Sequence, residues 1–124
     1  MGAVAYDGDL ARFADDAAGR SLAMWGTDGV LEAIHVTPFG SLPGSVVINF
    51  ATIDAVCHAW DLAASVGQPI EFPPHMIPTI SVVVAATCTD AVRELGLIKP
   101  VAPTPAGATD TERLMATAGR SVRP

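Results

Sequence analysis

One long segment, residues 44–66, does most to restrict the folds that this chain can adopt. Pro43 suits the first turn of a helix that begins there, and Gly67 suits the position just past its end. The segment therefore predicts the longest helix of the chain. Helical spacing places one broad and largely apolar set of residues on a single face: Val47, Phe50, Ala51, Asp54, His58, Asp61, Leu62 and Ser65.

The region before this helix predicts one amphipathic helix and an extended segment. Apolar residues recur at helical spacing over residues 9–25, and Asp9 can cap the start. Residues 26–29 hold two glycines and break the helix. Residues 31–37 alternate weakly between apolar and polar, which indicates an extended segment or a short strand, and residues 38–44 form a turn-rich entry.

The region after the long helix is harder to interpret. Residues 80–84 prefer a strand by propensity, but the length of the 75–95 segment, its early Pro78 and its polar end favour a helix. Three prolines predict an extended surface strap over residues 99–107. A short last helix is expected over residues 110–118, stopped by Gly119. The whole pattern predicts an all-α fold.

Composition limits the class of protein. The 124 residues predict a single domain, and half of them are apolar while 16% are charged, as in a folded chain. Seven basic against thirteen acidic residues give a net charge of -6, which argues against nucleic-acid partners and against docking on anionic membranes. The start of the chain does not resemble a signal peptide, and the apolar run at 82–86 is too short to span a bilayer. We expect a soluble, cytoplasmic protein.

Asp54 and His58 are the strongest candidates for chemistry. They lie one helical turn apart on the same face, where a carboxylate and an imidazole can hold one divalent metal between them. The commoner interpretation of this spacing is an Asp–His hydrogen bond, and a metal would need at least one more ligand. Asp61 can orient His58, but the more frequent arrangement for such a residue is to pair with an arginine or to face water.

The remaining candidates are weaker. Trp60 is expected to pack in a core or an interface. His35 and His75 are expected to be surface or capping histidines, and Arg120 is expected to bind nearby helix carbonyls. Cys57 and Cys88 form no CxxC pair and read as reduced, buried thiols, and Cys57 lies about 100° around the helix from His58. The sequence contains no G-x-S-x-G, P-loop or G-x-G-x-x-G motif.

Three motifs in order resemble one known family. The main motif is Val56-Cys-His-Ala-Trp-Asp-Leu-Ala-Ala-Ser-Val-Gly-Gln-Pro69. A second motif, the turn Thr37-Pro-Phe-Gly-Ser-Leu-Pro-Gly44, comes before it in the chain. The third joins Pro100-Val-Ala-Pro-Thr-Pro-Ala to Arg113-Leu-Met-Ala-Thr-Ala-Gly-Arg120. Together they resemble the mycothiol-dependent maleylpyruvate isomerase-like proteins of the DinB/YfiT-like superfamily of metal-binding four-helix bundles. The resemblance also favours a helix over residues 75–95.

The resemblance implies a site and an activity. It implies that Asp54 and His58 bind a divalent metal, with zinc expected first and nickel, iron or manganese as alternatives. It implies that the metal activates mycothiol or a related small thiol for thiol transfer or isomerisation. In such proteins a histidine at the end of the first helix completes the site. This sequence lacks that helix, so residues 1–124 are expected to form a single partial domain of the bundle.

Without that helix, its neighbours would expose a large apolar stripe. We therefore expect a homo-oligomer, with protomers exchanging helices and a partner chain supplying the third ligand. Two alternatives stay open, a non-catalytic interaction module that keeps the bundle's remnant and a truncated gene product without a function of its own.

Overall fold

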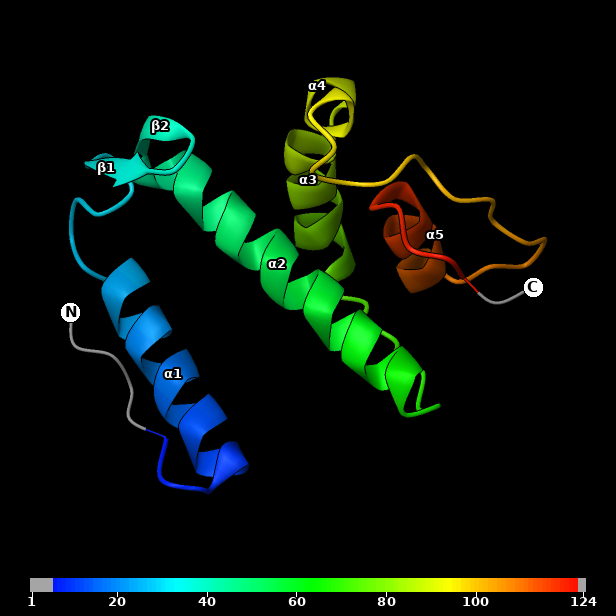
Figure 1. Ribbon diagram of the computed structural model, residues 1–124, viewed down its shortest axis with the longest axis horizontal. Helices are drawn as coiled ribbons and strands as arrows, with labels where there is room; N and C mark the ends of the chain where they lie inside the picture. Colours follow the sequence, from blue (N-terminus) through cyan, green and yellow to red (C-terminus); the bar gives the residue numbers. More distant parts are fainter. Residues whose placement is uncertain (1–5, 123–124) are drawn as a thin grey trace. The chain divides into compact units, whose positions relative to one another are not determined.

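The computed structural model describes residues 6–122, which are mainly helical (Figure 1). This confirms the expected all-α class as a mainly helical chain with one small sheet. The chain divides into two compact units, one ending at Ile48 and the other beginning at Asn49. The elements follow one another as α1 (Leu10–Trp25), β1 (Ile34–Thr37), β2 (Gly40–Pro43), α2 (Gly44–Ser65), α3 (Ile77–Thr87), α4 (Asp90–Glu94) and α5 (Asp110–Thr117).

In the first unit, α1 begins as its sequence predicts. The Asp9 carboxylate accepts a hydrogen bond from the Arg12 backbone N–H at 3.0 Å, which satisfies one of the free donors of the first turn. The helix is amphipathic, yet none of its residues is buried, and Leu10 and Leu22 are 70% and 74% exposed. The amphipathic pattern is therefore confirmed as a helix but not as a buried face.

The expected extended segment is one strand of a hairpin. β1 and β2 pair antiparallel from Ile34↔Pro43 to Thr37↔Gly40. The Thr37 hydroxyl donates to the Gly40 carbonyl and accepts from the Phe39 N–H, and Gly40 adopts a φ of 109°. A glycine adopts that backbone conformation without steric cost, so a two-residue turn closes here. The prediction of a turn-rich entry over residues 38–44 did not include this second strand.

The long helix is confirmed to within one residue, since α2 runs Gly44–Ser65. Gly67, with a φ of 69°, lies just past its end, and the Gln68 N–H donates to the Ala63 carbonyl at 2.9 Å. Of the described helices, α2 alone is long and apolar enough to cross a bilayer by length and composition. Core helices of soluble proteins meet the same criterion, and the apolar run at residues 82–86 lies in the shorter α3.

The second unit has its own hydrophobic core. One face of α2 meets residues from α3, from the turn after α3 and from α5. Met115, in α5, has no exposed surface, and Ile80, in α3, is 2% exposed. The buried members of this core are Val56, Cys57, Trp60, Ile80, Val84, Cys88, Met115 and Ala118. Trp60 thus packs in a core, as predicted.

The ambiguous 75–95 segment is helical but broken. α3 ends at Thr87, and the Thr89 hydroxyl accepts from the Val92 N–H to start α4. Arg93, whose side chain is 13% exposed, donates to the Cys88 carbonyl at 2.9 Å and to the Thr117 carbonyl at 2.7 Å. These bonds satisfy carbonyls near the ends of two helices and explain why the chain turns here.

The strap over residues 99–107 contains no regular element, as its prolines predict. The Ala102 N–H donates to the Ala116 carbonyl at 2.9 Å, which holds the strap against α5. The Thr109 hydroxyl and the Glu112 carboxylate cap the start of α5 reciprocally. These contacts fix the last residues before Arg120 on the body of the second unit.

Candidate functional site

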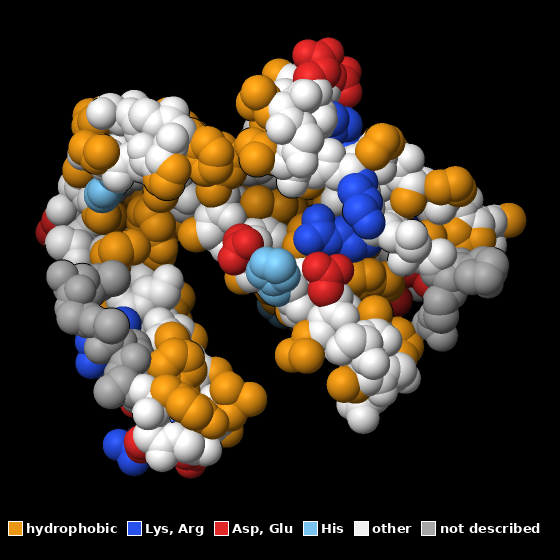
Figure 2. Space-filling view, viewed as in Figure 1, with side chains coloured by type: hydrophobic (Ala, Val, Ile, Leu, Met, Phe, Trp, Pro, Cys, Tyr) orange, Lys and Arg blue, Asp and Glu red, His pale blue; other side chains and the backbone are white. Residues whose placement is uncertain are grey.

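Asp54 and His58 lie on the same face of α2. The Asp54 Oδ1 and His58 Nε2 atoms are 3.1 Å apart, and the two side chains are 73% and 68% exposed. Histidine, acidic and basic side chains gather over this part of α2 (Figure 2). The two predicted metal ligands are therefore adjacent and open to approach from outside the described chain.

The exposure of this pair corrects one step of the prediction. The sequence pattern placed both residues within an apolar face, where burial would cost several kcal/mol without a partner or a metal. The structure buries a different side of α2, formed by Val56, Cys57, Trp60 and Ala63. Apolar residues occur around most of this helix, so spacing alone did not identify the buried side. No burial cost therefore requires a metal at this pair.

Asp61 lies on the other side of the His58 ring. Its Oδ2 atom is 3.7 Å from His58 Nδ1, which is too long for a hydrogen bond, and it accepts from Arg120 Nη2 at 3.2 Å. Arg120 Nε donates to the second oxygen at 3.4 Å. The more frequent arrangement, a carboxylate paired with an arginine, is thus confirmed for Asp61.

Arg120 is held firmly at this position. Its Nη1 donates to the Ala118 carbonyl at 3.0 Å, which confirms the predicted contact with a nearby helix carbonyl. Burial by itself lowers the pKa of Arg120, but the hydrogen bond and the charge of Asp61 outweigh it and raise that pKa above its ordinary value. The guanidinium is therefore permanently charged and stays with Asp61.

The described residues supply only part of the ligand set that a metal ion needs. Asp54 and His58 supply one oxygen and one nitrogen donor, but within residues 6–122 no group of three or more His, Cys, Asp or Glu side chains could hold a metal ion. Asp61 already binds Arg120. The described chain thus offers two ligands, and a complete site needs a donor from elsewhere.

The other histidines do not add a ligand. His35 Nε2 lies 3.0 Å from the Val30 carbonyl, and its ring packs edge-on against Trp25 with centroids 6.3 Å apart. His75 is exposed in the turn before α3. His75 matches the predicted surface role, whereas His35 is half-buried and contacts a carbonyl that belongs to no helix, so it is neither a surface nor a capping histidine.

The two cysteines are free and buried, as predicted. Burial raises the pKa of the Cys57 thiol to about 11, although the charge of Arg120 acts in the opposite direction. A thiol with so high a pKa is almost entirely protonated near neutral pH and is a poor nucleophile. Cys57 is therefore a core residue and does not form a Cys–His nucleophile pair with His58.

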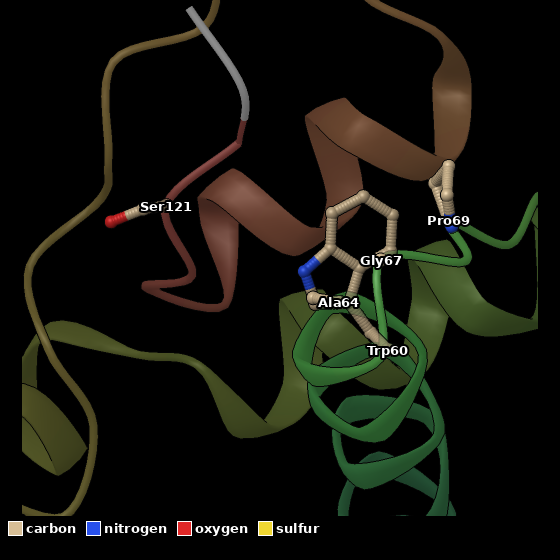
Figure 3. Close-up of a pocket in the computed structure, with 5 residues that line it drawn as sticks. All are labelled: Trp60, Ala64, Gly67, Pro69 and Ser121. Atoms are coloured by element: carbon tan, nitrogen blue, oxygen red, sulfur yellow. The ribbon is translucent and has the colours of Figure 1, made fainter.

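A small pocket in the second unit was not anticipated from the sequence. Trp60, Ala64, Gly67, Pro69 and Ser121 line a space of about 140 Å³, with the indole ring as its largest wall (Figure 3). Three of these residues recur at i, i+4 and i+7 on and just after α2, a spacing that marks one helix face. That spacing could have indicated a shared helix face in the sequence, but Ser121 reaches the pocket only through the tertiary fold.

Comparison with known proteins finds relatives without an assigned function. The chain is similar to uncharacterized proteins from two strains of Mycobacterium tuberculosis, CDC 1551 / Oshkosh and ATCC 25618 / H37Rv. Each is 35% identical over 98 residues, which cover 77% of this chain and 53% of the relative. The chain therefore spans about half the length of the curated relatives it matches. No protein-family model matches the chain. No solved structure gives a significant match.

Proposed function

We propose that this chain belongs to a cytoplasmic, divalent-metal-binding protein of the mycothiol-dependent isomerase or thiol-transferase type, built on a DinB/YfiT-like helical bundle. The observation that carries this proposal is the Asp54–His58 pair, with donor atoms 3.1 Å apart on an exposed face of α2. The order of the three sequence motifs around this pair supports the same family.

Asp54 and His58 would hold the metal through one oxygen and one nitrogen donor. Zinc suits such a set best, and nickel, iron and manganese also accept mixed nitrogen and oxygen ligands. A bound metal would supply acidity, since a thiol that coordinates it loses its proton near neutral pH. Asp61 lies on the Nδ1 side of His58, 3.7 Å from that atom, and Arg120 holds its carboxylate in this position.

A second copy of the chain would supply the third ligand. Two observations support this part of the proposal. The described residues offer only two donors at the pair, and α1 has an amphipathic sequence without a single buried residue. Self-association would cover apolar surface and bring a donor to His58 at the same time.

A second candidate function is a non-catalytic interaction module with the same bundle ancestry, acting as an oligomer. The lack of a three-residue metal group within the described chain favours it. In this case Asp54 and His58 form an ordinary i, i+4 pair on an exposed helix face, worth a few tenths of a kcal/mol. The two candidates differ in metal content.

Metal content per chain, measured by elemental mass spectrometry on untagged protein fractionated by size, tests the proposal. We expect near-stoichiometric metal in an oligomeric fraction, and none in the same fraction of His58→Ala. A folded, metal-free oligomer would overturn the metal site and support the interaction module. Metal bound to a monomeric fraction would contradict the proposal that a second copy of the chain supplies the third ligand.

A further inference from the structure

The wall of the pocket beside Trp60 carries a hydrogen-bond donor that no described residue accepts. Trp60 is 7% exposed, and its indole N–H has no hydrogen-bond acceptor among residues 6–122. No buried side-chain nitrogen or oxygen is left unpaired within residues 6–122, so the indole N–H faces the open pocket, where it is accessible to solvent. Figure 3 shows the indole nitrogen on the ring edge nearer Ser121, while the Ser121 hydroxyl points away from it. An acceptor at that edge must come from solvent or from a ligand.

The rest of the pocket is apolar and small. The Ala64 methyl, the Pro69 ring and the bare backbone of Gly67 surround the indole, and none of them carries a side-chain donor or acceptor. The space of about 140 Å³ is close to that of cavities near 150 Å³ which take up benzene. The pocket therefore has room for one six-membered ring.

The charges near the pocket argue for a neutral ligand. Asp61 follows Trp60 and Arg120 precedes Ser121, and these two charged residues neutralise each other through two hydrogen bonds. A ligand carboxylate would have to compete with Asp61 for Arg120, and the chain as a whole carries a charge of -6. Among the described residues, the pocket lining therefore offers a ligand no unpaired positive or negative side chain.

We propose that this pocket binds a small, uncharged, ring-bearing molecule whose carbonyl or other acceptor sits next to the ring and accepts the Trp60 indole N–H. The ring would stack on the indole between Ala64 and Pro69. The site is separate from Asp54 and His58, because Trp60 lies about 200° around the helix from His58. It therefore does not depend on the metal proposal.

Benzamide is a suitable probe, since it joins one ring to one amide carbonyl without charge. The chain has two tryptophans, so ¹⁵N-labelled protein gives two indole N–H signals, which the Trp25→Phe variant assigns. We expect benzamide to shift the Trp60 signal and leave the Trp25 signal in place, with a Kd on the order of 1 mM for so small a ligand. Toluene, which has the ring but no acceptor, should give a smaller shift.

Two leucine variants on different faces of α2 test the location. Ala64→Leu should weaken benzamide binding by at least about tenfold, because the larger leucine side chain would occupy the volume that the benzamide ring needs. Ala59→Leu makes the same change at an exposed position that does not line the pocket, so it should bind as the wild type does. Equal shifts of both tryptophans, no shift of Trp60, or wild-type binding by Ala64→Leu would each overturn the proposal.

Discussion

Arg120 binds Asp61 through two hydrogen bonds, 3.2 Å and 3.4 Å long, across 59 positions of the sequence. The pair joins the segment after α5 to the exposed side of α2. The Arg120 side chain is 23% exposed and the Asp61 side chain 43%, so solvent screens the pair only in part. It also sits between the two surface features of this helix, the Asp54–His58 pair and the pocket beside Trp60.

Asp61→Asn should lower the free energy of unfolding. The substitution removes the charge that Arg120 faces and leaves a partly buried guanidinium with weaker partners, at a cost of about 1–2 kcal/mol. Asp54→Asn is the matched control, because its exposed pair with His58 contributes a few tenths of a kcal/mol. Urea unfolding of both variants measures the difference, and equal losses would show that the Arg120 contact adds no stability.

The helices could be predicted from the residues that start and stop them. Asp9 caps α1, Gly67 follows α2 and Gly119 follows α5, and each acts through local chemistry that a sequence displays. The break between α3 and α4 was missed because Thr89 caps a helix within a run that otherwise continues the pattern. The second strand was missed because β2 consists of only four residues in a segment dominated by turn-forming residues.

The candidate site could be predicted only as a pair. The i, i+4 spacing places Asp54 beside His58 in any helix, and the structure agrees. The buried side of α2 could not be chosen, because it depends on Ile80 and Met115, which reach it from other elements. The Trp60 pocket depends on Ser121 for the same reason. These contacts join segments that are far apart in the sequence, so they cannot be predicted from the local pattern of residues.

His58→Ala should abolish metal binding, while His35→Ala should leave it intact. Loss of a direct ligand costs more than loss of an outer-sphere partner, which already lowers metal affinity by about 10–100-fold. His35 is a fair control because it contacts the Val30 carbonyl and Trp25 in its own unit. Equilibrium dialysis against zinc, followed by metal analysis, makes the comparison. Equal loss in both variants would show that Asp54 and His58 are not the ligands.

Stability should fall as the pH rises from about 9 to about 11, in part because of Cys57. Its pKa rises from 9.0 to about 11 in the fold, so the folded state holds the proton over a range where the unfolded chain releases it. The stabilisation is complete below pH 9 and is lost as the pH passes about 11, and two pKa units correspond to about 2–3 kcal/mol.

The Cys57→Ala variant isolates this contribution. It should be less stable than wild type at pH 7, because it leaves a small cavity in the core, and the difference should shrink between pH 9 and 11. Denaturant unfolding at four pH values measures it. A difference that stays constant over this range would mean that the Cys57 thiol does not gain its proton affinity from folding.

Gly119→Ala should destabilise the chain far more than Gly67→Ala. Both glycines have a positive φ, 79° and 69°, so each alanine meets a backbone cost of about 1 kcal/mol. At Gly67 an added Cβ meets nothing within 4 Å, whereas at Gly119 it would lie 2.7 Å from the Lys99 carbonyl oxygen. That clash involves backbone on both sides and cannot be relieved by turning a side chain. We therefore expect a loss of about 1 kcal/mol for Gly67→Ala and about 3 kcal/mol or more for Gly119→Ala in urea unfolding. Equal losses would show that the segment around Lys99 does not pack against Gly119 in solution.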